Sequence, residues 1–585
     1  MASRAPLACL WLMTACGGAQ RYPLAAPIDD DGDRQPVSVS CAIRATEKDE
    51  KHVACAPEPY VSPLAWDAVD NSIFRPFARV WAVDPAGEAV NVNAFDEVPD
   101  SAWFENRIGK RKPAREALLR GACTPEEMLD PAGVAPGAWL IDQGKANGAS
   151  AGFRIKIDGH RKYMLKTDVK LQPERPSASS VIGAAIYYAV GFNTSCEQII
   201  YADPQVFRLS PGLKVTDNTG ITKPFDRAAL ARVLDGATPR GPLRRLQASA
   251  WLPGYLIGPF RYEGTRSDDP NDVIPHEDRR DLRGARVLAA WLDHFDAREQ
   301  NTMDSWIAVN SKANDSSPGF VRHYYLDMSD TLGSEWFDDG ISRRLGHSYL
   351  LDWGDIATDF ATLGTQVRPW DTVQRTPGMA DFGYFNSYAF EPELWKNEYP
   401  NPAFSRASEH DNAWMARILS RFEDDDIRAL VTLGRFSQAE HTAFVAQVLV
   451  ERLQKILVRY LLRLSPLAEL RVDGNVLSMV DLARRRLVLP ASAFAYRARL
   501  DVPGAANTLH PTVGDGGVVA LTLPHRSFAR GVADGDPARY CVVTIANGAS
   551  RYALRAYLYD LGAERGFRLV GIERPEQGFD ELSKL

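Results

Sequence analysis

The spacing of apolar residues changes several times along this chain, and this pattern limits the folds that the chain can adopt. Apolar and polar residues alternate in 152–166, on both sides of an Asp-Gly turn, which predicts a β-hairpin. Apolar residues recur at helical spacing in 179–192 and over a longer stretch in 411–464. Short alternating runs return in 468–585. This order of elements predicts a mixed α+β protein of several domains.

The first sixteen residues have the layout of a secretory signal peptide. One arginine precedes an apolar run, 7–13, and small residues lie before Cys16. The ending Met-Thr-Ala-Cys resembles the bacterial lipobox, which implies that Cys16 is diacylated and anchors the chain to a membrane. An aspartate after such a cysteine tends to retain lipoproteins in the inner membrane. Because Gly17 stands there, we expect the outer membrane of the cell envelope. An ordinary signal peptide with an accidental cysteine is the alternative.

The cysteines of the mature chain bear on its compartment. Besides Cys16 they are Cys41, Cys55, Cys123, Cys196 and Cys541. Five cysteines cannot all pair within one chain. In an oxidising compartment we expect a disulfide between Cys41 and Cys55, because they lie close together in a loop-like segment.

The charge of the chain excludes one class of partner. The formal net charge is −7, and acidic and basic residues are interspersed along the sequence. Proteins that bind nucleic acids carry a basic patch or stripe. We therefore expect no nucleic acid partner. Beyond the signal peptide no apolar run approaches the ~20 residues that span a bilayer, so the predicted contact with the membrane is the lipid anchor.

A loop of small residues precedes the second strand of the predicted hairpin. The loop contains Gly148, Ser150 and Gly152, and the strand ends at Lys166. Small residues let backbone N–H groups approach phosphate oxygens, and a strand lysine supplies a fixed positive charge. These residues are the candidate nucleotide-binding set. The alternative is an ordinary turn next to a solvated edge lysine.

Two further polar elements follow the amphipathic helix that is predicted at the start of 281–310. Asp296 and Asn301 lie five residues apart in a loop, and Asp327 ends the strand that returns from it. Oxygen ligands of this kind suit Mg²⁺, a hard cation. In kinases an aspartate and an asparagine at this spacing activate the acceptor hydroxyl and bind the metal. Asp296 is therefore the candidate catalytic base, and Asn301 and Asp327 are the candidate metal ligands.

Taken in order, these features resemble the protein-kinase-like superfamily, in the atypical branch with the HipA-like and lipid-kinase-like enzymes. The resemblance covers about 141–465, and phrases such as DEVPDSAWFENR and WKNEYPNPAF resemble a group of bacterial proteins with the same core. It implies a bilobal protein-kinase-like core that binds ATP and Mg²⁺. The acceptor substrate does not follow from it.

With this resemblance the chain divides into six parts. They are the signal peptide 1–16, a flexible tether 17–65, a β-rich N-terminal extension 66–140, a kinase-like N-lobe 141–235, a helical C-lobe 236–467 and a small C-terminal β-sandwich 468–585.

One departure from the kinase pattern concerns the lysine. The helix after it should carry a glutamate that holds the lysine on the phosphates. Ser179 or Ser180 stands at that position, with Glu174 upstream and Glu197 downstream as possible substitutes. A second polar cluster, 264–280, contains Asp272, His276 and Glu277. Its spacing fits no known zinc pattern, and we expect its charges to pair with one another.

Three functions compete on this sequence. The first is an ATP-dependent phosphotransferase on a membrane-anchored, extracytoplasmic kinase-like protein. The second is a catalytically inactive kinase-like scaffold or binding lipoprotein, which the missing helix glutamate favours. The third is hydrolysis or nucleotidyl transfer at the same Mg-nucleotide site. The scarcity of ATP outside the cytoplasm weighs against the first.

Overall fold

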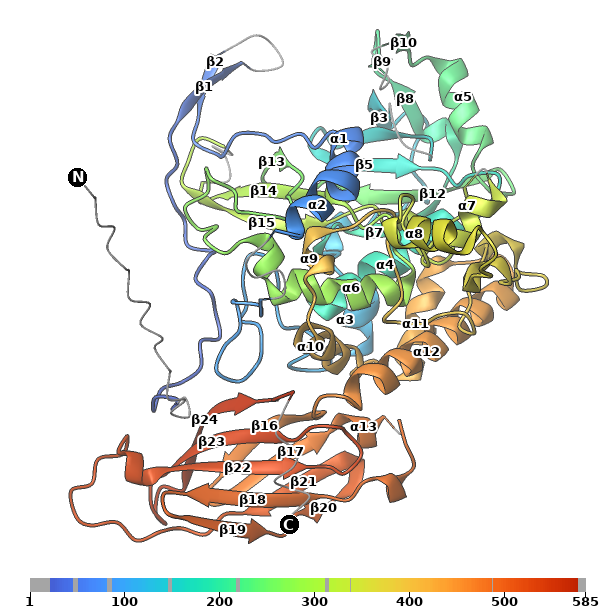
Figure 1. The fold of residues 1–585 in the computed structure, drawn as a ribbon. Coiled ribbons are helices and arrows are strands. Elements are labelled where there is room, and N and C mark those ends of the chain that lie inside the picture. The colour runs from blue at the N-terminus through green and yellow to red at the C-terminus, as the bar shows by residue number, and fades with distance from the viewer. Residues whose placement is uncertain are drawn as a thin grey trace, which may run out of the picture.

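The computed structural model describes residues 21–45, 51–81, 87–145, 150–216, 221–310, 315–336, 338–486 and 488–576. The predicted signal peptide, Cys16 and Gly148 lie outside these residues. The described chain is a mixed α+β protein with several sheets (Figure 1).

The described residues of the expected tether pack against distant parts of the chain. The ring of Tyr22 packs against that of Tyr557 in a tilted arrangement, with centroids 4.9 Å apart. Val37 pairs with Gly319 in an isolated bridge. The strands β1 (Ala42–Ala45) and β2 (Lys51–Ala54) form a hairpin. The predicted disulfide Cys41–Cys55 is confirmed beside it. These contacts hold the described part of 17–65, so the prediction of a free tether is wrong there.

The predicted β-rich extension, 66–140, is largely helical and irregular. Its regular elements are α1 (Leu64–Val69), the π-helical turn η1 (Asp70–Phe74), α2 (Arg75–Arg79), α3 (Arg115–Arg120), the 3₁₀ turn η2 (Pro125–Glu127) and the first residues of β3. The aromatic residues of 66–81 recur at helical spacing, because Trp66, Phe74, Phe77 and Trp81 are three, four or eight residues apart. The prediction of strands is wrong here. Aromatic residues are common in strands, but the spacing of these residues is that of a helix.

A large sheet carries the predicted hairpin. Its strands are β3 (Trp139–Gly144), β4 (Gly152–Ile157), β5 (Arg161–Lys166), β7 (Glu197–Ala202), β8 (Phe207–Leu209), β11 (Pro239–Arg240) and β12 (Leu243–Ala250). The order is β11-β12-β5-β4-β3-β8, and β7 also pairs with β12. The hairpin β4–β5 is confirmed. So is helix α4 (Arg175–Val190), which ends at Gly191. A separate two-stranded hairpin and a helix follow β8: β9 (Lys214–Thr216), β10 (Thr222–Pro224) and α5 (Arg227–Asp235).

A second, four-stranded sheet and a group of helices follow. The sheet has the order β13-β14-β15-β6. Its strands are β13 (Tyr255–Gly258), β14 (Thr302–Ala308), β15 (Gly319–Tyr325) and β6 (Asn193–Thr194). The helices are α6 (Arg280–Leu292), α7 (Asp339–Arg344), α8 (Trp353–Thr362), α9 (Pro402–Ser405), α10 (Glu409–Leu419), α11 (Asp424–Val431) and α12 (Ala439–Leu461). Apart from α8, which has no buried residue, these helices pack apolar side chains into one core with α4.

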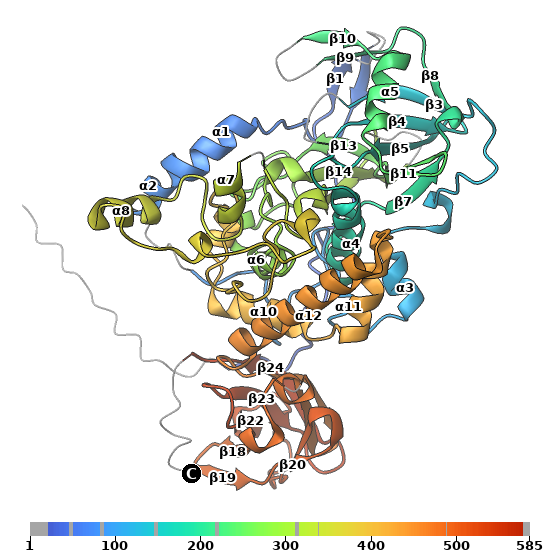
Figure 2. The same ribbon diagram turned by 90° about the vertical axis from the view of Figure 1, so that its right-hand side faces the viewer.

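The C-terminal residues form two sheets that enclose one apolar core, at the bottom of Figures 1 and 2. The first sheet has the order β16-β17-β21-β20 and the second β19-β18-β22-β23-β24. The elements are β16 (Leu467–Asp473), β17 (Val476–Asp481), α13 (Leu482–Arg485), β18 (Arg497–Val502), β19 (Ala505–Leu509), β20 (Thr512–Val513), β21 (Val518–Thr522), β22 (Tyr540–Ala546), β23 (Leu554–Asp560) and β24 (Phe567–Glu573). We call this part the C-terminal β domain.

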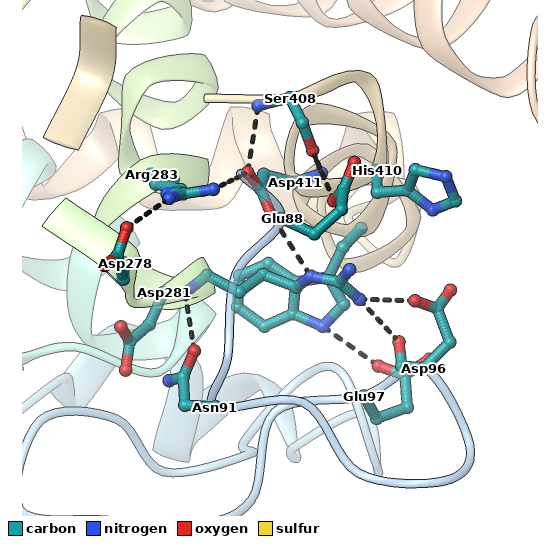
Figure 3. A network of polar contacts seen from close by, with 12 residues as sticks. Glu88, Asn91, Asp96, Glu97, Asp278, Asp281, Arg283, Ser408, His410 and Asp411 are labelled. Atoms are coloured by element: carbon teal, nitrogen blue, oxygen red, sulfur yellow. Dashed lines mark hydrogen bonds and ion pairs between the residues drawn. The ribbon is translucent and has the colours of Figure 1, made fainter. Parts of the chain in front are cut away.

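A buried carboxylate joins this domain to the helices. Asp96 accepts hydrogen bonds from Arg280 at the start of α6, from Arg417 of α10 and from Arg574 after β24. Figure 3 shows the part of this network around Asp96, Asp411 and Arg283. Burial opposes ionisation of Asp96, but the three guanidinium groups hold its pKa well below the usual range. The charge of Asp96 therefore holds together elements that are far apart in the sequence.

We predict that Asp96→Asn lowers the free energy of unfolding by about 3 to 5 kcal/mol, because buried guanidinium groups lose their counter-charge. Urea denaturation followed by circular dichroism measures the change. Asp425→Asn is the matched control, because this exposed side chain makes a surface pair with Arg428, worth less than ~1 kcal/mol. Equal denaturation midpoints for the two variants would contradict this assignment.

Candidate functional site

Two of the predicted site residues form an ion pair. The Nζ atom of Lys166, at the end of β5, lies 2.9 Å from Oδ1 of Asp327, directly after β15. Lys166 is only 8% exposed. Burial favours the neutral form of each group, but each charge stabilises the other. The pKa of Lys166 is therefore raised, and that of Asp327 is held well below its usual range. The structure thus brings together one candidate nucleotide ligand and one candidate metal ligand.

The backbone around Asp327 directs its carboxylate to this pair. Asp327 has φ 51° and ψ 62°, in the left-handed region, and precedes the 3₁₀ turn η6 (Met328–Asp330). Aspartate tolerates this conformation better than most residues because its short polar side chain bonds locally. The hydroxyl of Ser329 donates to Oδ1 of Asp327 at 2.7 Å. The turn therefore orients the carboxylate at the end of the strand.

The loop between α6 and β14 contains Asp296 and Asn301. Asn301 Nδ2 donates to Oδ2 of Asp296 at 2.7 Å and to its backbone oxygen at 2.8 Å. Because Nδ2 of Asn301 is the donor in both bonds, the remaining side-chain atom, Oδ1 of Asn301, is a hydrogen-bond acceptor. Oδ1 of Asp296 is buried and makes no hydrogen bond within the described residues. It lies 3.3 Å from Nε2 of His294. Asn301 thus locks the loop and one carboxylate oxygen, and the other oxygen is left for a ligand.

His294 itself is a core residue. It is fully buried, and its Nδ1 atom lies 2.9 Å from the hydroxyl oxygen of Tyr187 in α4. Asp296 is also buried. Burial acts to raise the pKa of its carboxyl group, but His294 and Arg298 lower it by more. Asp296 therefore stays ionised at neutral pH, as a proton acceptor requires.

Asp330 belongs to the site and was not predicted. Its carboxylate accepts a hydrogen bond from the Ser334 hydroxyl at 2.8 Å. Burial and the neighbouring charges of Asp296 and Asp327 raise its pKa to about 7. The run Asp-Met-Ser-Asp, with a second aspartate three residues after Asp327, was the available sequence signal.

Lys145, just before the predicted phosphate loop, was missed as well. Its Nζ atom donates to the backbone oxygen of Ser150 at 2.7 Å, so it bridges the two sides of that loop. Burial and the charge of Lys166 lower its pKa to about 8. A lysine directly after the first strand of the sheet was its only signal. Two lysines therefore face the carboxylates at this site.

The described residues of the predicted phosphate loop have mixed roles. Ser150 is buried, and its backbone oxygen accepts the bond from Lys145. Gly152 is explained by packing alone, because a Cβ there would lie 2.3 Å from the backbone oxygen of Leu165 on β5. Gly148 lies outside the described residues. The glycine at 152 therefore gives no separate support for phosphate binding.

None of the four residues considered in place of a helix glutamate pairs with Lys166. The hydroxyl of Ser179 donates to the backbone of Thr331 at 3.0 Å. Glu174 accepts a hydrogen bond from the backbone of Ser437. The hydroxyl of Ser180 is buried and makes no hydrogen bond within the described residues.

Glu197, on β7, comes closest to that role. Its buried carboxylate accepts hydrogen bonds from Ser195, Gln247 and Ser249. It acts on Lys166 only through its charge, which helps to raise the pKa of the lysine. Asp327 is therefore the direct partner of Lys166.

The acidic residues of the site fit a divalent cation that shares its ligands with phosphate. Within the described residues no group of three or more His, Cys, Asp or Glu side chains is arranged to hold a metal ion. Mg²⁺ is usually bound by one or two carboxylates together with substrate phosphates and water. Oδ1 of Asp296 makes no hydrogen bond within the described residues, and burial together with the charges of Asp296 and Asp327 raises the pKa of Asp330. A cation would balance part of the negative charge of these carboxylates.

The second polar cluster forms internal pairs. Nε2 of His276 lies 2.8 Å from Oδ2 of Asp272, and Glu277 accepts a hydrogen bond from the backbone of Gly264. The pKa of His276 is raised, because the pair with Asp272 and the backbone oxygen of Arg261 outweigh burial. The contact of His276 with Asp272 agrees with the predicted pairing of charges within the cluster.

A large cavity lies apart from these residues. It has a volume of about 630 Å³ and is lined by α4, β7 and residues 119–134. A second disulfide, Cys123–Cys196, joins two of these elements and was not predicted. Glu197 lines the cavity, but Lys166, Asp296 and Asp327 do not. Cavity size alone would therefore point away from the charged site.

Comparisons with family models, with curated proteins and with solved structures give no match for this chain. Among the described helices, none is both long and apolar enough to cross a bilayer.

We predict that Asp330 makes the free energy of unfolding of the wild-type protein fall between about pH 4 and 7. The native carboxyl group, with a pKa of about 7, binds its proton more tightly than in the unfolded chain, where the pKa is near 3.8. Its contribution is therefore largest at low pH and is lost as pH rises, by up to ~1.4 kcal/mol per pH unit.

Asp330→Asn should remove this part of the pH dependence, as measured by thermal denaturation at several pH values. The exposed Asp534→Asn is the control and should keep the wild-type profile. Parallel profiles for the wild type and Asp330→Asn would refute the assignment to Asp330.

Proposed function

We propose that this chain binds ATP with Mg²⁺ at Lys166 and Asp327 and transfers a phosphoryl group to a hydroxyl acceptor. The observation that carries the proposal is the 2.9 Å pair of Lys166 and Asp327. In protein kinases a lysine on the third strand and an aspartate after the catalytic loop act on the same nucleotide and metal. Here Lys166 ends the third strand of the large sheet in chain order, and Asp327 follows the loop of Asp296 and Asn301.

The proposed fold is a bilobal kinase-like core. The proposed N-lobe, 141–235, would contain most of the large sheet with α4, and the proposed C-lobe, 236–467, would contain α6 to α12. Two strands of the sheet, β11 and β12, come after this boundary. The order of elements supports this division: a loop of small residues, a strand lysine, a helix, and later a polar loop followed by a hairpin that ends in an aspartate. The site lies where these parts meet.

The proposed location is the outside of the cytoplasmic membrane, with Cys16 lipidated and the outer membrane favoured. Two disulfides, Cys41–Cys55 and Cys123–Cys196, support an oxidising compartment. The remaining described cysteine, Cys541, is buried in the C-terminal β domain. The anchor itself rests on the sequence of the first seventeen residues.

In the proposed reaction the acceptor oxygen attacks the γ-phosphorus of ATP, its proton passes to Asp296, and ADP leaves. Asp296 suits this role because one carboxylate oxygen is held by Asn301 and the other makes no hydrogen bond within the described residues. Lys166 and Lys145 place positive charge toward the phosphates. Asp327 and Oδ1 of Asn301 would hold Mg²⁺, which neutralises charge on the phosphates when it is bound.

The second candidate is an inactive scaffold with the same core. Two observations favour this candidate. No glutamate of α4 pairs with Lys166, and Asp327 already forms an ion pair with this lysine. Hydrolysis or nucleotidyl transfer at the same site remains a third outcome of the test.

The decisive measurement is the thermal shift of the chain from Gly17 onward, titrated with ATP and Mg²⁺ or Mn²⁺. We expect metal-dependent stabilisation that is larger at pH 8 than at pH 6, because the carboxylate of Asp330 is ionised at the higher pH. Asp327→Asn should weaken binding at least tenfold. Asp296→Asn should keep binding but lose about 10² to 10⁴ in phosphoryl transfer.

Asp534→Asn is the matched control and should behave like the wild type, because its carboxylate is exposed and pairs with Arg565. The absence of a shift at millimolar nucleotide in the wild type would reject the proposal in favour of the scaffold. Equal loss of binding in Asp296→Asn and Asp327→Asn would reject the separate roles.

A further inference from the structure

Helix α8 is oriented with its apolar side toward solvent. Phe360 is 84% exposed and Leu363, the residue that caps the helix, is 89% exposed. Of its acidic residues, Asp355 is partly buried and lies 3.4 Å from Arg368, whereas Asp359 pairs with the same guanidinium group but is 53% exposed. A surface helix normally buries its apolar face and exposes its charges. The exposed apolar residues of α8 therefore indicate an apolar partner outside the described residues.

A second helical segment shows the same reversal. The elements α1, η1 and α2 are continuous in sequence from Leu64 to Arg79. The polar side chains of Asp67 and Asn71 are buried, and Asp67 bonds to Tyr399 and Gln300. The large aromatic residues of this segment are exposed, and Trp81, two residues after α2, is 85% exposed.

The two segments meet and form one surface. The rings of Phe77 and Trp353 are in edge contact with centroids 6.0 Å apart, and Trp353 Nε1 donates to the backbone oxygen of Ser72 at 2.7 Å. Figure 2 shows α1, α2 and α8 together on one side of the molecule. The exposed apolar residues of this surface, which we call the apolar ridge, are Trp66, Val69, Phe74, Phe77, Val80, Trp81, Trp353, Ile356, Phe360 and Leu363.

We propose that the apolar ridge docks on a phospholipid bilayer. Tryptophan and phenylalanine on one face of short helices are typical of segments that lie in the membrane interface. Contiguous exposed apolar patches of this kind mark sites of interaction. The inference goes beyond the proposed phosphotransfer and does not depend on it.

The chemistry of the ridge favours lipid over protein. A protein interface needs about one hydrogen bond per 100–200 Å², so its rim offers polar groups. The polar groups that flank the ridge are already engaged: Asp355 and Asp359 bond with Arg368, and Trp353 Nε1 bonds with Ser72. The interior of a bilayer has no hydrogen-bonding groups, so a surface that enters it needs no free polar groups.

The start of the described chain supports the same occupant. Tyr22 packs against Tyr557 of the C-terminal β domain. Only four residues separate Arg21 from Cys16, the expected lipidation site. Five extended steps span at most about 18 Å, so a lipidated Cys16 would keep this domain close to a bilayer. Such a tether raises the effective concentration of the membrane at any second contact.

The test is flotation of the chain from Gly17 onward, without an acyl group, with vesicles of phosphatidylethanolamine and phosphatidylglycerol. We expect the wild type to float with the vesicles and Phe360→Ser with Leu363→Ser to reduce binding at least tenfold. Because both side chains are exposed, the thermal midpoint should not change. The control pair Val273→Ser with Val309→Ser removes residues that are 75% and 67% exposed elsewhere, and should bind as the wild type does.

A spin label gives a second readout. Leu363→Cys offers an exposed thiol, whereas the described native cysteines are in disulfides or, for Cys541, buried. Vesicles should increase the oxygen accessibility of a nitroxide at this position. Failure of the wild type to float, or an unchanged label, would overturn the proposal. Self-association that the double serine variant abolishes would assign the ridge to a second copy of the chain instead. Both results leave the nucleotide titration unaffected.

Discussion

The ionised carboxylate of Asp96 is the interaction on which the arrangement of the parts depends. It is buried among Arg280, Arg417 and Arg574, which come from α6, α10 and the end of the C-terminal β domain. A buried charge is tolerated only when it is paired. The three elements must therefore keep their positions together. Because α6 leads directly into the loop of Asp296, the C-terminal β domain is coupled to the candidate site.

The candidate site contains two lysines and three aspartates. Lys166 and Lys145 lie near the carboxylates of Asp296, Asp327 and Asp330, and the pKa of Asp330 is raised by burial and by the charges of the other two aspartates. In the kinase pattern a helix glutamate takes up the lysine and leaves the aspartate for the metal. In this chain Asp327 serves as the partner of Lys166, so a nucleotide and its cation would have to compete for both groups.

Local pattern predicted the elements that lie inside one periodic segment. The hairpin β4–β5, helix α4 up to Gly191 and the disulfide Cys41–Cys55 followed from alternation, helical spacing and proximity. The disulfide Cys123–Cys196 did not, because its cysteines are 73 residues apart. The prediction of a flexible tether failed because its described residues are held by distant contacts, such as that of Tyr22 with Tyr557. The prediction of a β-rich extension failed because the apolar residues of 66–81 follow a helical period instead.

The sequence by itself determined which residues share a face of each helix or strand, since backbone geometry sets that period. It also determined the order of the candidate site residues, and Lys166 and Asp327 do meet. Only the tertiary structure decided what each face meets. It placed Asp330 and Lys145 among the site residues, gave Lys166 an aspartate as its partner, and turned the apolar side of α8 outward. These features depend on contacts between distant segments, and the spacing of apolar residues along the chain does not predict such contacts.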